Sequence, residues 1–214
     1  MFVQYLFTDF QFFFWWIIIM VFSICVHELG HAVMAYQEGD DTAKNLGYFT
    51  LNPMVHMGSA SLVLLFLVGI CWGACPVNPS KFKKPYSDAL VSFAGPMANL
   101  LLLVLFALMG VLLSLGASLL PDVAVTNLLE FSYLGAKLNA ALFLLNMLPL
   151  PPLDGHVVWA SIFPPLKSFY AQVGNAGFVV IMMLFWLPIG FSEFFWDLSA
   201  TMARTCYGVM TFWV

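Results

Sequence analysis

Charged residues are scarce in this sequence. Only 8% of the 214 residues are Asp, Glu, Lys or Arg, and the formal net charge is −4. There is no run of acidic or basic residues of the kind that favours nucleic-acid binding, so we expect no nucleic-acid partner. Hydrophobic residues, in contrast, make up 62% of the chain, which is typical of an integral membrane protein.

Long polar stretches are also missing, so there is no room for a separate water-soluble domain. We therefore expect one membrane-embedded domain over residues 1–214, with its core at about residues 10–165 and C-terminal helices at about 174–214. The first apolar segment has no basic residues before it and no small-residue cleavage site followed by a polar mature chain. This pattern predicts a retained span rather than a signal peptide.

Cysteine is sparse as well, and the four residues do not form the spaced framework of a disulfide-rich domain. They lie in or beside apolar stretches, where we expect them to pack as small hydrophobic side chains. Cys71 and Cys75 would be one helical turn apart, a spacing that also suits metal binding or a covalent bond.

Six apolar segments predict helices. The sequence thus favours an all-α polytopic protein of about six transmembrane helices, with short re-entrant or extended loops near a functional site, in a prokaryotic cytoplasmic membrane. The segments are Phe10–Tyr36, Ser59–Ala74, Tyr86–Leu120, Val123–Leu148, Gly174–Phe191 and Phe194–Val214.

The second segment is short for a full span. Lys81, Lys83 and Lys84 follow it and favour a cytoplasmic loop, and Lys44 places the preceding loop on the same side. A helix that crosses the membrane cannot satisfy both assignments. We therefore expect residues 59–74 to be tilted, re-entrant or otherwise not an ordinary span.

The motif "HELGH" stands inside the first apolar segment. On a helix, the four-residue spacing brings His27 and His31 to one face, about 6 Å apart along the axis, where they can share a metal ion. Glu28 lies beside them and can act on a metal-bound water without being a ligand. Because a carboxylate in a span costs about 2.5 to 3.5 kcal/mol, this cluster indicates a functional site rather than satisfied core residues.

A catalytic zinc ion usually has three protein ligands and one open position. The strongest candidate for the third ligand is Asp154, in a proline-rich stretch that interrupts the helices at membrane depth. Asp154 would also suit the N-cap of a helix over Gly155–Phe163. His56, His156 and Glu38 are alternatives, and both histidines are otherwise expected in loops or in hydrogen bonds to the ligands.

Two motifs in this order resemble the site-2 proteases, the intramembrane zinc metalloproteases of peptidase family M50: "HELGH", and "NMLPLPPLDG" at Asn146–Gly155. The segments "GDDTAKNLGYFTLNPMVH", "PVNPSKF" and "FAGPMAN" extend the resemblance over about residues 20–165. The chain is most similar to the compact bacterial and archaeal branch, which has no PDZ or CBS domain.

The resemblance implies one Zn²⁺ per chain, bound by His27, His31 and Asp154, with Glu28 as the general base toward zinc-activated water. It places Asn146 near the substrate or the developing oxyanion, and Asn99 either at the cavity or in a hydrogen bond between helices.

The implied activity is hydrolysis of peptide bonds within or near transmembrane segments. The implied partners are a single-span membrane protein as substrate and the lipid bilayer. A separate regulatory or substrate-presenting protein and a homo-oligomer are both left open.

Two other functions are weighed against this one. A metal-ion transporter would use the same cluster but would place polar residues along several spans, and few are present. A catalytically inactive membrane adaptor of the same fold would not need the complete set of catalytic residues that this sequence contains.

Overall fold

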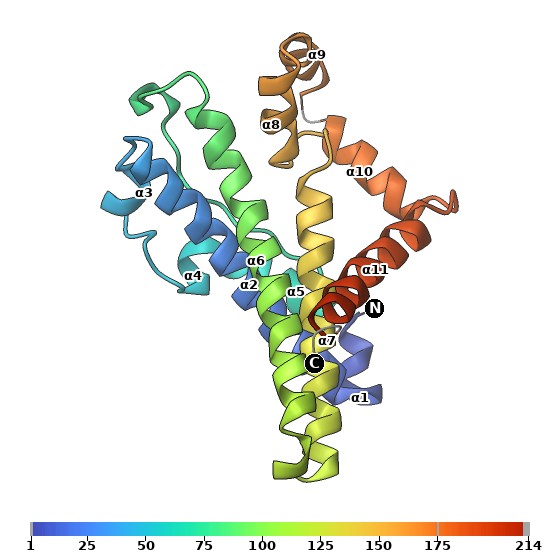
Figure 1. Cartoon of the computed structure of the whole chain (residues 1–214). Helices are drawn as coiled ribbons and strands as arrows, with labels where there is room; N and C mark the ends of the chain where they lie inside the picture. The colour runs from blue at the N-terminus through green and yellow to red at the C-terminus, as the bar shows by residue number, and fades with distance from the viewer. Residues whose placement is uncertain (1, 175, 212–214) are drawn as a thin grey trace.

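A computed structural model describes residues 2–174 and 176–211, and within these residues every regular element is helical (Figure 1). The four longest helices are α2 (Phe10–Gln37), α6 (Ser87–Leu115), α7 (Asp122–Asn146) and α11 (Phe191–Thr211). The shorter α-helices are α1 (Tyr5–Thr8), α3 (Thr42–Asn45), α4 (Pro53–His56), α5 (Gly58–Val68), α8 (Gly155–Ile162), α9 (Pro165–Val173) and α10 (Ala176–Trp186), and the 3₁₀ turns are η1 (Phe2–Gln4), η2 (Pro79–Lys81) and η3 (Ala117–Leu119).

The helices α2, α6 and α7 have 25 to 29 residues and are apolar enough to cross a membrane. At a rise of 1.5 Å per residue they extend over about 37 to 44 Å, more than the hydrocarbon thickness of about 30 Å. The helices α9 and α10 meet the same test only as a pair that bends by 85°. The prediction of an all-α membrane protein is confirmed, while the count of about six spans is not.

The predicted helix over residues 59–74 is wrong at its C-terminal end. α5 ends at Val68, where Gly69 takes a left-handed conformation with φ of 82° and caps the helix. Residues 70–78 follow without helical or strand structure. Cys71 and Cys75 are therefore not one turn apart on a helix, and with only 11 residues α5 is too short to span.

The short helix resolves the conflict between the lysines. The loop after α2 and the loop before α6 pack together, because the N–H of Lys83 donates to the carbonyl of Glu38 and Lys81 pairs with Asp41 at 2.6 Å. Helix α5 and residues 70–78 together thus bring the chain back to the end of α2, so the loops that carry Lys44 and Lys81 lie on the same side.

The other predicted segments match helices with shifted ends. Tyr86–Leu120 and Val123–Leu148 correspond to α6 and α7, which are separated by the η3 turn and Pro121. Gly174–Phe191 becomes α10, which is shorter. Phe194–Val214 becomes α11, and the last three predicted residues lie outside the described part of the chain. α11 carries Glu193, Asp197 and Arg204, so it is less apolar than the three spans.

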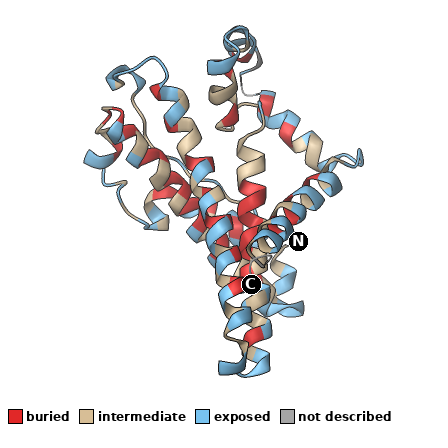
Figure 2. Cartoon of the chain, viewed as in Figure 1, coloured by how far each residue is buried: buried red, intermediate tan, exposed pale blue. Residues whose placement is uncertain are grey.

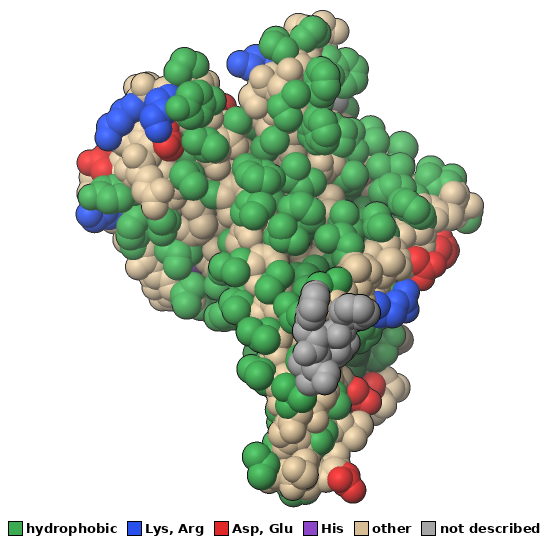
Figure 3. All heavy atoms as spheres, viewed as in Figure 1, with side chains coloured by type: hydrophobic (Ala, Val, Ile, Leu, Met, Phe, Trp, Pro, Cys, Tyr) green, Lys and Arg blue, Asp and Glu red, His purple; other side chains and the backbone are tan. Residues whose placement is uncertain are grey.

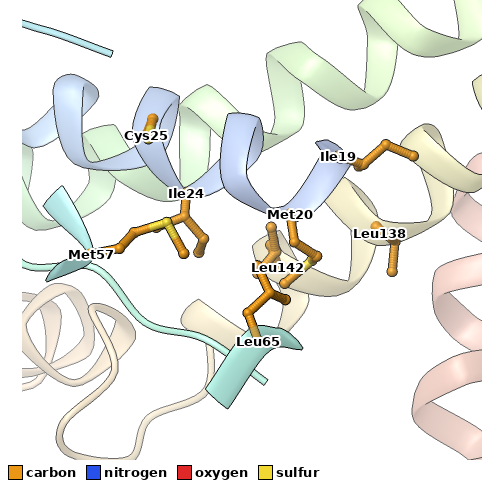
Figure 4. Packing of buried hydrophobic residues seen from close by; sticks show 8 residues of the cluster. All are labelled: Ile19, Met20, Ile24, Cys25, Met57, Leu65, Leu138 and Leu142. Atoms are coloured by element: carbon orange, nitrogen blue, oxygen red, sulfur yellow. The ribbon is translucent and has the colours of Figure 1, made fainter. Parts of the chain in front are cut away.

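The core lies where α2 meets α6 and α7. Figure 1 shows α6 and α7 running side by side with α2 beside them, and buried residues gather at this junction in Figure 2. A cluster of apolar side chains joins α2, α5, α7 and the residue before α5 (Figure 4). Its members are Ile19, Met20, Ile24, Cys25, Met57, Leu65, Leu138 and Leu142. Cys25 is 1% exposed and packs as a small hydrophobic residue, which accounts for its place two residues before His27.

Large hydrophobic residues also cover the outside of the helices. Figure 3 shows them over most of the visible face, with charged side chains gathered near its edges. A surface of this kind fits lipid contact and agrees with a membrane protein.

Candidate metal centre

The two histidines of the "HELGH" motif face the same point, as the helical spacing predicts. His27 and His31 are 4% and 8% exposed, and their Nε2 atoms are 3.0 Å apart. Asp154 Oδ2 lies 3.1 Å from Nε2 of His27 and 3.4 Å from Nε2 of His31. Among the described residues, these three form the group of side chains arranged to hold a metal ion.

Asp154 reaches this group because α8 folds back onto the end of α7. The indole N–H of Trp159 donates to the carbonyl of Met147 at 2.9 Å. A side chain at Gly155 would overlap the Met147 and Leu148 carbonyls, so only glycine allows this close approach. Asp154 occupies the N-cap position of α8, but its carboxylate makes no capping hydrogen bond. The carboxylate points to the histidines instead.

The hydrogen bond made by Nδ1 of each imidazole determines whether Nε2 carries a hydrogen or a lone pair. The Nδ1–H of His31 donates to the Val91 carbonyl at 2.7 Å, and the Nδ1–H of His27 donates to Oδ1 of Asn99 at 2.6 Å. Each Nε2 therefore presents a lone pair to the other Nε2 and to the carboxylate. Three acceptors at 3.0 to 3.4 Å from one another suit a shared cation between them.

Zinc fits this donor set. Ligand bonds of about 2.0 to 2.1 Å in a tetrahedron place the ligand atoms about 3.3 Å apart, which is close to the separations seen here. A carbonyl or amide oxygen on the outer nitrogen of each histidine is also the usual arrangement around a bound zinc ion.

Glycine in α6 leaves room for the two rings. Gly95 is buried against the edges of both imidazoles, and an added methyl group would overlap His31 and His27. This contact explains why α6 approaches α2 so closely at this level.

Glu28 is 6% exposed and does not belong to the three-ligand group. The backbone of Gly73 lies directly against its carboxylate, so any side chain at position 73 would overlap it. Segment 70–78 therefore passes over Glu28. This arrangement leaves Glu28 next to the metal ligands on α2 without making it one of them.

The other candidates for the third ligand do not reach the group. Glu38 lies in the loop after α2, and its carboxylate accepts hydrogen bonds from Lys84 and from Ser87 at the start of α6. His56 Nε2–H donates to the Thr50 carbonyl, and His156 Nδ1–H donates to the Leu153 carbonyl. Within the described structure neither histidine hydrogen-bonds to a member of the group, and a supporting role for them stays a prediction.

Asn99 and Asn146 have different surroundings. Asn99 is fully buried and hydrogen-bonds to His27 on α2 and to Asn139 on α7, so it forms a hydrogen bond between helices, while its role toward the cavity or the substrate stays a prediction. Asn146 is half-buried at the end of α7, and its amide donates to the Leu142 carbonyl of its own helix. Its role toward substrate stays a prediction.

Comparison with known proteins agrees with this geometry. The family described as "Peptidase family M50" matches residues 15–126, which include "HELGH" and "FAGPMAN". The chain belongs to peptidase family M50. Curated relatives extend the similarity over most of this M50 chain.

One relative is "Putative zinc metalloprotease YwhC" of Bacillus subtilis, 40% identical over 81% of this chain and 81% of its own length. The proteins named "Putative zinc metalloprotease Rip2" in Mycolicibacterium smegmatis and Mycobacterium tuberculosis are 31% identical over 78% of this chain and 64% of their length. No solved structure matches the M50 chain significantly.

Sequence reasoning missed four residues around the centre of this M50 chain. Asn139 and Ser23 are fully buried and join Asn99 in a hydrogen-bonded chain. Gly73 contacts Glu28, and Asp40 binds the end of segment 70–78. Only Asn139 had a readable signal, since an amide in the middle of an apolar run needs a partner.

Asp40 holds segment 70–78 from outside the spans. Its carboxylate is fully buried and accepts hydrogen bonds from the N–H of Asn78 at 2.6 Å and from the N–H and hydroxyl of Thr42. Burial alone would raise the pKa of Asp40, but these hydrogen bonds and the charge of Lys81 together hold it below its usual value. Asp40 is therefore ionised at neutral pH.

Proposed function

We propose that this M50 protein hydrolyses peptide bonds within or near the transmembrane segments of single-span membrane proteins, with one Zn²⁺ bound by His27, His31 and Asp154. The observation that carries the proposal is the meeting of three lone-pair donors beside Glu28: His27 and His31 lie with Glu28 on α2, a helix apolar enough to span a bilayer, and Asp154 follows α7, which is another such helix. That the protein is a zinc metalloprotease follows from its family and its relatives.

The residues of the chain divide the chemistry between them. When bound, zinc would polarise the scissile carbonyl and lower the pKa of a water molecule. Glu28 takes a proton from that water and delivers it to the leaving amine. Its place on α2, next to His27 but outside the ligand group, suits proton transfer to and from that water.

A substrate helix must unwind before its backbone can be cleaved, because its carbonyls are hydrogen-bonded within the helix. The hydrogen bonds of segment 70–78 suggest how the protein holds the unwound substrate. The N–H and carbonyl of Trp72 pair with the Ser61 hydroxyl, and the N–H of Ala74 pairs with the His56 carbonyl. In an extended backbone, neighbouring residues point to opposite sides.

We infer that the N–H and carbonyl groups of Cys71, Gly73 and Cys75, which alternate with these paired residues, face away from Ser61 and His56. The described chain supplies them with no hydrogen-bond partner. We propose that an unwound substrate pairs with this open edge as an added strand, which brings its backbone to Glu28.

The test is cleavage of a single-span protein reconstituted with the purified enzyme in lipid vesicles. Glu28→Gln keeps the shape of the side chain but removes the base, so zinc content should stay near one per chain while cleavage falls by at least about 100-fold. Glu130→Gln, which changes an exposed carboxylate on α7, is the matched control and should cleave normally.

Three results would contradict the proposal. Retained cleavage by Glu28→Gln would remove Glu28 from the mechanism. A folded wild type without zinc would favour an inactive adaptor. Zinc flux across the vesicle membrane that does not depend on Glu28, in the absence of cleavage, would favour a transporter.

A further inference from the structure

We propose that Asn139 of α7 is a positioning residue that determines which nitrogen of His27 binds the metal, acting through Asn99. The inference rests on the proposed zinc site but not on the proposed substrate. It follows from a chain of buried hydrogen bonds that joins α7, α6 and α2.

The series of hydrogen bonds begins at the backbone carbonyl of Gly135, which can only accept a hydrogen bond. The amide N–H of Asn139 donates to the backbone carbonyl of Gly135 at 2.9 Å and to the hydroxyl of Ser23 at 2.9 Å. A backbone carbonyl has no hydrogen to give, so the NH₂ group of Asn139 must face Gly135. The carbonyl oxygen of its side chain must then face the other way, toward Asn99.

The orientation passes from one amide to the next. Oδ1 of Asn139 accepts from the NH₂ group of Asn99 at 3.1 Å, so Oδ1 of Asn99 faces His27. Because an amide oxygen only accepts, Nδ1 of His27 must carry the hydrogen. Nε2 is left with its lone pair, directed at His31 and Asp154.

Asn99 alone would not be held in this orientation as firmly. Its NH₂ group has one further partner, the Ser23 carbonyl, at 3.5 Å, which is too long for a strong hydrogen bond. Asn99, Asn139 and Ser23 are all fully buried, so no water competes for these groups. Losing Asn139 would leave the Asn99 amide nearly free to flip and to present its NH₂ group to His27.

The consequence is a loss of zinc affinity rather than a loss of the ligands. Removing a partner that orients a ligating histidine typically weakens metal binding by about 10- to 100-fold. We expect about tenfold for Asn139→Ala and Asn139→Leu, and Leu fills the space that Ala leaves. Asn99→Ala should have at least as large an effect.

The experiment measures zinc affinity of the purified protein in detergent by competition with a chelator. Ser132→Ala is the matched control, because Ser132 is also fully buried on α7, two turns before Asn139, and pairs with Tyr207 instead of the site. It should bind zinc as tightly as wild type. In the Asn99→Ala background, Asn139→Leu should weaken binding by no more than about twofold, since its effect passes through Asn99.

A spectroscopic readout tests the protonation of His27 in the wild type itself, with an intact Asn139. The chain has four histidines, so ¹⁵N-histidine NMR of the zinc-loaded protein can be assigned with His56→Gln and His156→Gln. We expect hydrogen on Nδ1 of His27 in the wild type and a mixture of signals in Asn139→Leu.

Zinc affinity of folded Asn139→Leu within twofold of wild type, an undiminished effect in the Asn99→Ala background, or metal bound through Nδ1 of His27 would each overturn the inference. Loss of cleavage in Glu28→Gln tests the proposed function separately, because that variant should keep the wild-type zinc affinity and the wild-type His27 signals.

Discussion

Gly95 of α6 faces the two imidazole rings of α2 with no side chain between them. Beside it, the outer nitrogens of His27 and His31 are paired with Asn99 and Val91, which directs both inner nitrogens to one point. At the scale of single residues, the site therefore depends on close backbone approach and on the hydrogen bonds behind the ligands as well as on the ligands themselves.

Gly95→Ala should weaken zinc binding strongly, because the added methyl group overlaps both rings and forces them or α6 to shift, at a cost of about 1 to 3 kcal/mol. The measurement is zinc affinity by chelator competition. Gly116→Ala at the end of the same helix is the control, since its methyl group meets only ordinary contacts. Equal affinities for the two variants would show that the site tolerates a wider separation of α2 and α6.

At the scale of single elements, segment 70–78 is held in place against Glu28 by contacts to three residues. Ser61 and His56 hold one edge of it, and Asp40 holds its end at Asn78. The three attachments come from different parts of the chain and keep Gly73 against Glu28. Loosening one of them should move the segment without changing the metal ligands.

Asp40→Asn should loosen segment 70–78, because the NH₂ group that replaces one carboxylate oxygen cannot accept the hydrogen bonds from Asn78 or from Thr42, and the loss of charge weakens those that remain. We expect about tenfold faster hydrogen exchange in residues 70–78, with zinc content unchanged. Asp41→Asn, which removes an exposed carboxylate paired with the same Lys81, is the control. Unchanged exchange in Asp40→Asn would show that Ser61 and His56 suffice.

The pH dependence of this attachment has a defined sign. The pKa of Asp40 is lowered in the folded protein from its usual 3.8, so its stabilising effect is complete above that value and is lost as the pH falls through the folded pKa. Exchange in residues 70–78 should accordingly show no contribution from Asp40 titration between about pH 5 and pH 8.

At the scale of the whole molecule, the metal would join parts that are distant in the sequence. His27 and His31 belong to α2, whereas Asp154 follows α7 and opens α8. The apolar cluster that joins α2, α5 and α7 is made of other residues, so this part of the packing does not depend on the ligands. The helices should therefore remain folded without zinc, and bound zinc should add a further link between α2 and the start of α8.

Removal of zinc by a chelator should lower the melting temperature with little loss of helix content in circular dichroism. Free zinc at 100 times its Kd stabilises the folded state by about 2.7 kcal/mol, and this contribution disappears on chelation. Asp154→Asn should reduce the difference between melts with and without zinc. A melting temperature that does not respond to zinc in the wild type would contradict a metal bridge between α2 and α8.

Local patterns predicted much of this protein because the physical causes are local. The helical repeat places residues four apart on one face, so His27 and His31 were paired correctly from the sequence alone. The prolines before Asp154 predicted the break after α7. The Ser59–Ala74 helix failed because apolar composition alone does not distinguish a helix from a buried non-helical segment, and the stop at Gly69 was not recognised.

The sequence by itself determined the membrane class, the family, the paired histidines and the Glu28 beside them, since composition, motif order and helical spacing need no tertiary contact. Only the tertiary structure decided that Asp154 and not His56, His156 or Glu38 completes the group. It also brought Asn139 behind His27 and laid segment 70–78 over Glu28. These contacts join residues far apart in the chain, and the packing of α2 against α6 and α7 is what sets them.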